Sequence, residues 1–571
     1  MVNARLIFVG LLISLASCQR LSIPERSQKA LPEDVEISSN EVGRYGGTLV
    51  ATNSGEPTGF HPLVIEDADT AEISELMLSG LTTQDPVTQE TVPALAKSWE
   101  LSPDRKTYTF HLRRGLRWSD GQPLTADDVI FTFDAVMATE IDPKTGQALP
   151  RFPNRYIQQY TLAGKPIRYE KIDDLTVRFI TPELYAPFIN DVGFINILPK
   201  HKLHASFLDG SLLKQWTVET AIKQPQELVC SGPFTLLSYR PGDRLILQPN
   251  PHYWRADRSG QRLPYLDLYV VKFVKDANAE LVNFATGQSD YSPIPAPDVG
   301  WVKRGEKTYD YTVHERGPST GISFIWFNQK PGQDANGKPY LPPYKLKWFQ
   351  DRRFRQALAY GFNREGIIQG VFFGRARPLH SMISEANLKW HYAGTPRFDY
   401  QPERAKAMLR EAGFQFKDSL LYDAEGNQVQ FELLLPQGSA TAPQIINSFS
   451  EDMKKLGIFV KISPIEFSTL IARVSQTFDY EASIMGFTGG GDPSGGKAIY
   501  LSSGRMHLWN PNQPKPATPW EARIDTLMEL QEKSFDPAQR KAYVDEIQSI
   551  LAEERPLLFL VTPDTYLGLK K

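Results

Sequence analysis

Patterns typical of β-strands and of α-helices alternate along this chain, and that alternation restricts its fold more than any single motif does. Residues 107–112 alternate between polar and apolar side chains, which is the pattern of a strand with one buried face. Thr125 to Asp128 then has the spacing of a helix capping box. Residues 244–248 and 556–561 have the composition of strands. The mixture predicts an α/β architecture, and a chain of 571 residues is expected to form two or more lobes.

Four further segments have apolar side chains at helical spacing. They begin at Asp351, at Pro402, near Ile524 and at Asp536. The second of them is predicted to end at Gly413, because glycine commonly follows the last turn of a helix. Helices therefore alternate with strands as far as the C-terminal end.

The first eighteen residues have the anatomy of an export signal. Arg5 supplies a positive start, and residues 6–16 form an apolar run that is too short to cross a bilayer. The segment closes with Leu-Ala-Ser-Cys at residues 15–18, which resembles the lipobox of bacterial lipoproteins and predicts lipidation of Cys18. An ordinary cleavage site that contains a cysteine is the alternative. Residues 19–44 are polar, lack a sustained apolar period and are predicted to form a flexible tether.

Charge and cysteine content exclude several classes of protein. The net charge is −3 with basic and acidic residues in balance, which argues against a nucleic-acid partner. Cys18 and Cys230 are the only cysteines, so lipidation of the first leaves no disulfide within the chain. Aromatic residues make up 11% of the sequence, and such a share suits both a core and a large ligand cleft.

The segment GFTGGGDPSGG at residues 486–496 is followed by a lysine and nearly matches a nucleotide-binding P-loop. The position that should carry the magnesium-binding hydroxyl is Ala498, however, and Pro493 lacks one of the backbone N–H groups that would bind phosphate. Only a short stretch follows Lys497 before the next glycine. A nucleotide site is therefore not expected here.

Motifs for other chemistry are equally incomplete. Residues 317–321 fit the G-x-S-x-G pattern around Ser319, but residues 322–327 look like a strand where a hydrolase has a helix. His201 and His204 are close in sequence but have no acidic neighbours, so neither a metal site nor any other cofactor is expected. The sequence predicts no enzyme, and a hydrolase that uses Ser319 or a carboxylate remains the alternative.

Longer stretches carry a more specific signal, because each resembles a signature block of the bacterial extracellular solute-binding proteins of family 5, the peptide-binding proteins of ABC importers. The blocks occur in family order and are residues 94–133, 230–254, 349–374 and 400–414. The resemblance extends from about Tyr45 to the C-terminus. It implies the two-lobed class II periplasmic-binding-protein fold, with an extra subdomain on lobe I.

The resemblance also implies a division of the chain. The expected parts are a signal peptide (1–18), a tether (19–44), the first part of lobe I (45–92), its extra subdomain (93–205), the second part of lobe I (206–311), lobe II (312–515) and a return to lobe I (516–571). The implied function is capture of a peptide or other small solute between the lobes and its delivery to ABC permease subunits. The receptor would be a monomer, held by its lipid anchor in the periplasmic space or at the cell surface. An oligosaccharide or a metal chelate is the alternative cargo.

Site residues follow from the same resemblance. In peptide-binding relatives, the segment at 486–496 contains an aromatic residue, small residues and then an aspartate that pairs with the α-ammonium of the peptide. Phe487, Thr488 and Gly489 match the first positions, but Gly490 stands where the aspartate is expected, and Asp492 is the candidate replacement. A purely structural turn of Asp492 with Pro493 is the alternative. Other candidate ligand contacts, for which packing or capping is the alternative, are Asn53, Ser54, Glu56, Trp326 and Asn328.

Overall fold

The computed structural model describes residues 29–571, except for residues 66 and 194. The predicted signal peptide and Cys18 lie outside the described residues. Within them, none of the helices is long and apolar enough to cross a membrane. The second part of the predicted tether is held against the fold, because β1 (Glu36–Ile37) pairs with β15 (Arg255–Ala256) and Glu36 forms a 2.6 Å ion pair with Arg113.

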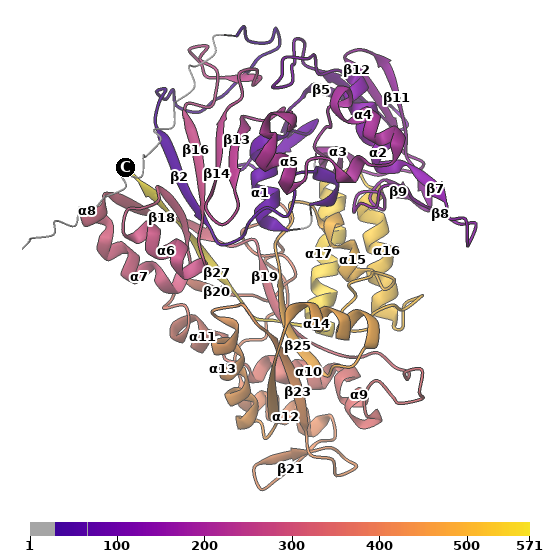
Figure 1. The fold of residues 1–571 in the computed structure, drawn as a ribbon. Helices are drawn as coiled ribbons and strands as arrows, with labels where there is room; N and C mark the ends of the chain where they lie inside the picture. The colour runs from indigo at the N-terminus through magenta and orange to yellow at the C-terminus, as the bar shows by residue number, and fades with distance from the viewer. Residues whose placement is uncertain (1–28, 66, 194) are drawn as a thin grey trace, which may run out of the picture.

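Two four-stranded sheets form the part that we call the first lobe (Figure 1). One has the order β13-β14-β16-β2 and the other has the order β11-β12-β6-β5. Their strands are β2 (Thr48–Asn53), β5 (Ala96–Leu101), β6 (Thr107–Leu112), β11 (Arg168–Asp173), β12 (Thr176–Ile180), β13 (Phe234–Arg240), β14 (Arg244–Pro249) and β16 (Leu268–Phe273). The helices packed with them include α1 (Ala68–Met77), α2 (Ala126–Met137), α3 (Phe188–Gly193) and α4 (Lys200–Asp209). A single apolar core, from Phe60 to Val271, joins the two sheets.

The local patterns of this lobe are confirmed. In β6 the side chains of Tyr108, Phe110 and Leu112 are buried, as the alternation predicted. Helix α2 begins with the predicted capping box. The hydroxyl oxygen of Thr125 accepts the backbone N–H of Asp127, and the carboxylate of Asp128 accepts the backbone N–H of Thr125.

A five-stranded sheet with the order β24-β23-β25-β19-β26 forms the centre of the second lobe. Its strands are β19 (Ile322–Phe327), β23 (Gln430–Pro436), β24 (Phe459–Ile465), β25 (Ala482–Phe487) and β26 (Leu557–Phe559). Because successive side chains of a strand point to opposite faces, Ile325 and Phe327 of β19 enter one core, and Phe324 and Trp326 enter another. The helices of the first of these cores include α10 (Arg352–Gly361), α12 (Pro402–Glu411) and α13 (Ala442–Lys455).

The C-terminal helices cover the other face of this sheet. Both α16 (Pro519–Lys533) and α17 (Pro537–Glu554) direct apolar stripes, which include Ile524, Leu527 and Ile547, into the core that holds Phe324 and Trp326. The expected return of residues 516–571 to lobe I stays a prediction: these two helices pack on the second lobe, whereas the last strand after them pairs with residues 291–294, which were expected in lobe I. The physical reason for the packing of the helices is that an apolar helix stripe is buried most completely on an apolar sheet face, and β19 and β26 supply one.

A further sheet, with the order β17-β27-β18, links the two lobes. It consists of β17 (Tyr291–Ile294), β18 (Tyr311–Pro318) and β27 (Val561–Lys570), and β20 (Ala376–Pro378) also pairs with β27. The chain passes from β18 into β19 through residues 319–321 and returns from β26 into β27 through Leu560. These two short connections are the natural pivots for a movement of one lobe against the other.

Cys230 is buried in the first lobe, and burial raises the pKa of its thiol to about 12. Because the thiolate is the reactive form, we expect Cys230 in the folded protein to react with iodoacetamide at least about a hundredfold more slowly than in the unfolded chain. Mass spectrometry of the peptide that contains Cys230, with and without urea, measures both rates. Rapid labelling of the folded protein would contradict the described burial.

Candidate functional site

The glycine-rich segment begins where a central strand of the second lobe ends. Strand β25 ends at Phe487, and after a short loop the chain forms a 3-10 turn (Pro493–Gly496) and α15 (Lys497–Tyr500). A P-loop needs a long helix at this point, and α15 has four residues. The lysine side chain forms a 2.6 Å ion pair with Glu532. This segment is therefore a loop that shapes a surface, as the sequence indicated.

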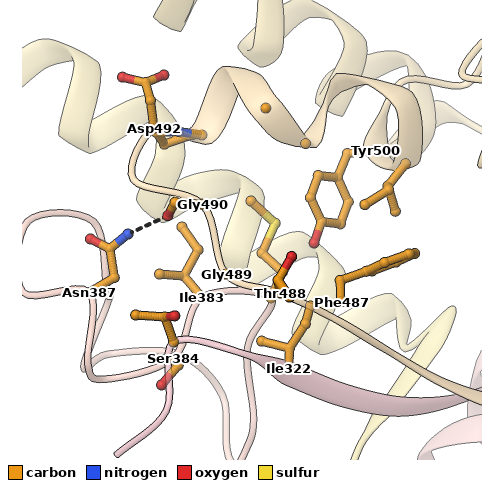
Figure 2. Close-up of a pocket in the computed structure, with 16 residues that line it drawn as sticks. Ile322, Ile383, Ser384, Asn387, Phe487, Thr488, Gly489, Gly490, Asp492 and Tyr500 are labelled. Carbon is orange, nitrogen blue, oxygen red and sulfur yellow. Dashed lines mark hydrogen bonds between the residues drawn. The ribbon is translucent and has the colours of Figure 1, made fainter. Parts of the chain in front are cut away.

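A small cavity of about 160 Å³ lies against this loop (Figure 2). Phe487, Thr488, Gly489, Gly490 and Asp492 all line it, so the structure brings together the five loop residues that the sequence selected. Further polar side chains of the lining are Thr320, Ser384, Asn387 and Tyr500, and the amide of Asn387 donates to the carbonyl oxygen of Gly490 at 3.1 Å. Asp492 is the one charged residue among those that line this cavity.

The carboxylate of Asp492 is fully engaged by the protein. Its oxygens accept two hydrogen bonds from the guanidinium of Arg540, at 2.8 and 2.6 Å, and one from Asn190 Nδ2 at 3.0 Å. Asp492 also caps the following turn, because Oδ1 accepts the backbone N–H of Ser494 at 3.0 Å. Figure 2 shows the carboxylate directed away from Phe487 and Tyr500. This geometry supports the structural role that the sequence left open as an alternative.

A larger cavity of about 890 Å³ lies between the two lobes. The first lobe supplies most of its wall, and Lys389, Trp390, Gly491 and Asp492 of the second lobe complete it. Its aromatic members come from five separate positions: Trp99, Tyr156, Tyr253, Trp254 and Trp390. The volume falls within the range of about 300–1,000 Å³ that is usual for small-molecule sites. Flat rings and polar groups together can bind an extended solute with both apolar and polar parts.

The lobes touch each other around this cavity. Besides the hydrogen bond from Asn190 to Asp492, the backbone N–H of Ala186 donates to the carbonyl oxygen of Glu532 at 2.7 Å. Lys389 of the second lobe forms a 3.1 Å ion pair with Glu90 of the first. The structure thus has the two lobes closed upon the large cavity.

Carboxylates crowd the contact between the lobes. Burial raises the pKa of Asp191, next to Asn190, to about 7, and the nearby charges of Asp492 and Glu532 act in the same direction. The hydroxyl of Tyr185 donates a hydrogen bond to Asp191, which favours the ionised form and opposes the shift. Burial likewise raises the pKa of Glu532, while Lys497 opposes that shift. The ionised forms of Asp191 and Glu532 are therefore disfavoured at this contact between the lobes.

The other predicted contacts lie outside the linings of both cavities. Asn53 is the last residue of β2, and its Oδ1 accepts the N–H of Gly55 at 3.2 Å. The backbone N–H of Ser54 donates to Glu280, and Glu56 accepts from the hydroxyl of Tyr239 at 2.9 Å.

Trp326 and Asn328 lie deeper still, in the interior of the second lobe. Both are fully buried, and Asn328 Nδ2 donates to the carbonyl oxygens of Phe478 and Tyr480 at 3.0 and 2.9 Å. The structure therefore separates these positions, and those of Asn53, Ser54 and Glu56, from the glycine-rich loop.

The alternative chemistries gain no support from the geometry. Ser319 stands between β18 and β19, so strands precede and follow it, and the helix that a nucleophile elbow requires is missing, as predicted. Its hydroxyl oxygen accepts the backbone N–H of Gly321 at 3.0 Å. In the part of the chain that the structure describes, no three His, Cys, Asp or Glu side chains are grouped so as to hold a metal ion.

Sequence reasoning missed most of the large cavity. Glu75 of α1, Arg155 and Trp390 line it, yet they are far apart in sequence and belong to no motif. The one local signal is on α1, where Ala71, Ser74 and Glu75, with Leu78 directly after the helix, have the spacing of a single helix face. Glu75, a charged residue between small and apolar residues on this face, is the sequence feature that could have indicated a binding site.

Comparison with known proteins places this geometry in context. A sequence model described as "Bacterial extracellular solute-binding proteins, family 5 Middle" matches residues 90–507. A "Probable ABC transporter-binding protein" from Deinococcus radiodurans is 28% identical over 550 residues, which cover 92% of this chain and 88% of the relative.

Solved structures agree with this match. The oligopeptide-binding protein AppA from Bacillus subtilis, in complex with a nonapeptide, has a TM-score of 0.70 at 26% identity and covers 92% of this chain and 95% of its own. The periplasmic binding protein MelB from Agrobacterium fabrum C58, in complex with stachyose, has a TM-score of 0.72 at 22% identity, with 95% and 83% covered. These matches confirm the prediction of a class II periplasmic-binding-protein fold.

Proposed function

The chain belongs to the bacterial extracellular solute-binding proteins of family 5, and on this premise we propose that it captures a peptide or peptide-like solute for an ABC importer. The observation that carries the proposal is the cavity of about 890 Å³ whose wall comes from both lobes. A ligand in that position contacts two bodies that are joined by two short connections, so it favours the closed arrangement. The closed, loaded protein would then dock on permease subunits in the membrane.

Within this proposal the two lobes divide the work. The loop residues Phe487 to Gly490 form a neutral wall of the small cavity on the second lobe, and the next loop residues, Gly491 and Asp492, reach the large cavity, most of which is lined by polar and aromatic groups of the first lobe. Release requires only that the lobes separate, since no bond of the solute is broken. We also propose that the protein is exported, anchored by lipidated Cys18 and monomeric.

An oligosaccharide is the second candidate cargo. Three tryptophans, Trp99, Trp254 and Trp390, line the large cavity, and the flat faces of indole rings bind the apolar faces of sugars. The solved relative that holds stachyose supports this alternative for the fold. Calorimetry with peptides and with stachyose, in the presence of a metal chelator, separates both from a metal-chelate cargo.

Binding is expected to change the shape of the protein. Native mass spectrometry of freshly purified protein should detect a bound solute, and its mass should return unchanged after release. Small-angle scattering should then give a smaller radius of gyration for the loaded than for the emptied protein, because the loaded form is closed. A shape that is the same with and without the co-purified solute, or a solute that is chemically altered on release, would refute the proposal.

A further inference from the structure

Some charged side chains that line the large cavity form ion pairs within the protein, and others do not. Two of its charged side chains on the second lobe are paired: Lys389 with Glu90 at 3.1 Å, and Asp492 with Arg540 at 2.6 Å. Arg255 of the first lobe is paired too, with Glu36 at 3.1 Å. Two charged side chains of the lining remain, Glu75 and Arg155.

Glu75 stands on the cavity face of α1. It is exposed, and among the described residues its carboxylate has neither a hydrogen bond nor an ion pair. Its neighbours on this face, Ala71, Ser74 and Leu78, are small or apolar, so nothing on the helix neutralises it. Although the side chain is open to the cavity, the surrounding protein removes part of its hydration, and this desolvation, together with the negative charge of Glu72, raises the pKa of Glu75. The site is therefore one in which a positive partner would be stabilised.

Arg155 provides the opposite charge on the same lobe. It is exposed, its guanidinium carbon lies 5.0 Å from the centre of the Tyr156 ring, and Nη2 donates to the hydroxyl of that tyrosine at 3.1 Å. No carboxylate among the described residues forms an ion pair with it. The guanidinium retains free N–H groups in a planar array, which is the arrangement that binds carboxylates most strongly.

We infer that the first lobe alone supplies both charged anchors for a zwitterionic solute, with Glu75 binding its cationic group and Arg155 its anionic group. This inference rests on the proposed function and specifies the class of cargo. The second lobe then contributes neutral contacts and closure, since its own charges in the cavity are already paired. A solute can thus be held by its charged ends before the lobes close. Short peptides with free termini have this chemistry.

The test uses the whole protein and oligoalanines of two to five residues in free, N-acetylated and C-amidated forms. We expect the free peptides to bind best, and Glu75→Gln to weaken them by at least about tenfold while hardly affecting the N-acetylated forms. Arg155→Gln should weaken the free peptides similarly and leave the C-amidated forms almost unchanged. Titration calorimetry measures all the affinities.

Matched control variants come from positions outside the cavity lining. Glu170→Gln and Arg168→Gln each alter an exposed charged residue of β11; neither should change the preference for free termini. Peptide binding that is indifferent to blocked termini, or equal losses for free and blocked peptides in Glu75→Gln, would overturn the inference and leave the proposed function standing. Failure of every oligoalanine to bind would overturn the inference; it would overturn the proposed function as well only if stachyose binds instead or if the co-purified solute is not a peptide.

Discussion

Replacement of Asp492 by asparagine is expected to lower the free energy of unfolding by about 3 kcal/mol, which is a large effect for a single polar atom. The side chains of Asp492 and Arg540 are each 9% exposed, and two hydrogen bonds join them. Asparagine keeps the size of the side chain and its cap on Ser494, but it leaves the buried guanidinium of Arg540 without its hydrogen-bonded ion-pair partner. Urea unfolding followed by tryptophan fluorescence measures the change.

A surface pair gives the control for this variant. Lys347 and Glu425 are only 2.6 Å apart, but their side chains are 68% and 57% exposed, so Glu425→Gln should change stability by less than about 1 kcal/mol. Adding Arg540→Met to Asp492→Asn should restore part of the loss, because it removes the stranded charge. Equal stabilities of Asp492→Asn and the wild type would show that the pair does not hold the loop.

The Asp492→Asn variant also distinguishes between the two interpretations of Asp492, an anchor for the ammonium group of a ligand and a purely structural turn. An ammonium anchor would make Asp492→Asn weaken a cationic peptide far more than a neutral sugar. Because both carboxylate oxygens already have partners, we expect similar losses for both solutes, caused by displacement of the loop. A selective loss for the cationic peptide would restore the anchor.

The second large effect is expected at Gly489. A methyl group at this position would lie 2.1 Å from the carbonyl oxygen of Thr320, which is part of the connection between the lobes. Gly489→Ala therefore forces the loop and the connection apart, with a loss of about 2 kcal/mol in stability. Solute affinity should fall by about tenfold or more, because the displaced loop carries Gly491 and Asp492 of the large cavity, and a shift of about 1 Å there removes van der Waals contacts. Thermal unfolding and calorimetry measure the two effects.

The adjacent glycine provides the matched control. A methyl group at Gly490 would have the carbonyl oxygen of Asp492, at 3.8 Å, as its nearest neighbour, which is an ordinary contact. Gly490→Ala should therefore leave stability close to wild type. If the two alanine variants behave alike, close packing of the loop against Thr320 is not what requires glycine.

Short-range patterns were sufficient for many features of the fold. The alternation at 107–112, the capping box at Thr125 and the helix from Asp351 are present where they were predicted. The rejection of the P-loop and of the nucleophile elbow also depended on neighbours within a few residues, and the four-residue α15 and the strand β19 agree with it. Such features are determined by hydrogen bonds and side-chain periodicity within one element.

The sequence by itself therefore determined an α/β chain of two lobes with a glycine-rich loop that shapes a cavity. Only the tertiary structure decided that Arg540, 48 residues further on, forms an ion pair with the carboxylate of Asp492. It likewise brought Glu75, Arg155 and Trp390 into the lining of one cavity. It also decided that α16 and α17 cover the second lobe. The reason is physical: a partner across the chain is selected by packing and by the need to compensate buried charge, and neither leaves a periodic signal in the local sequence.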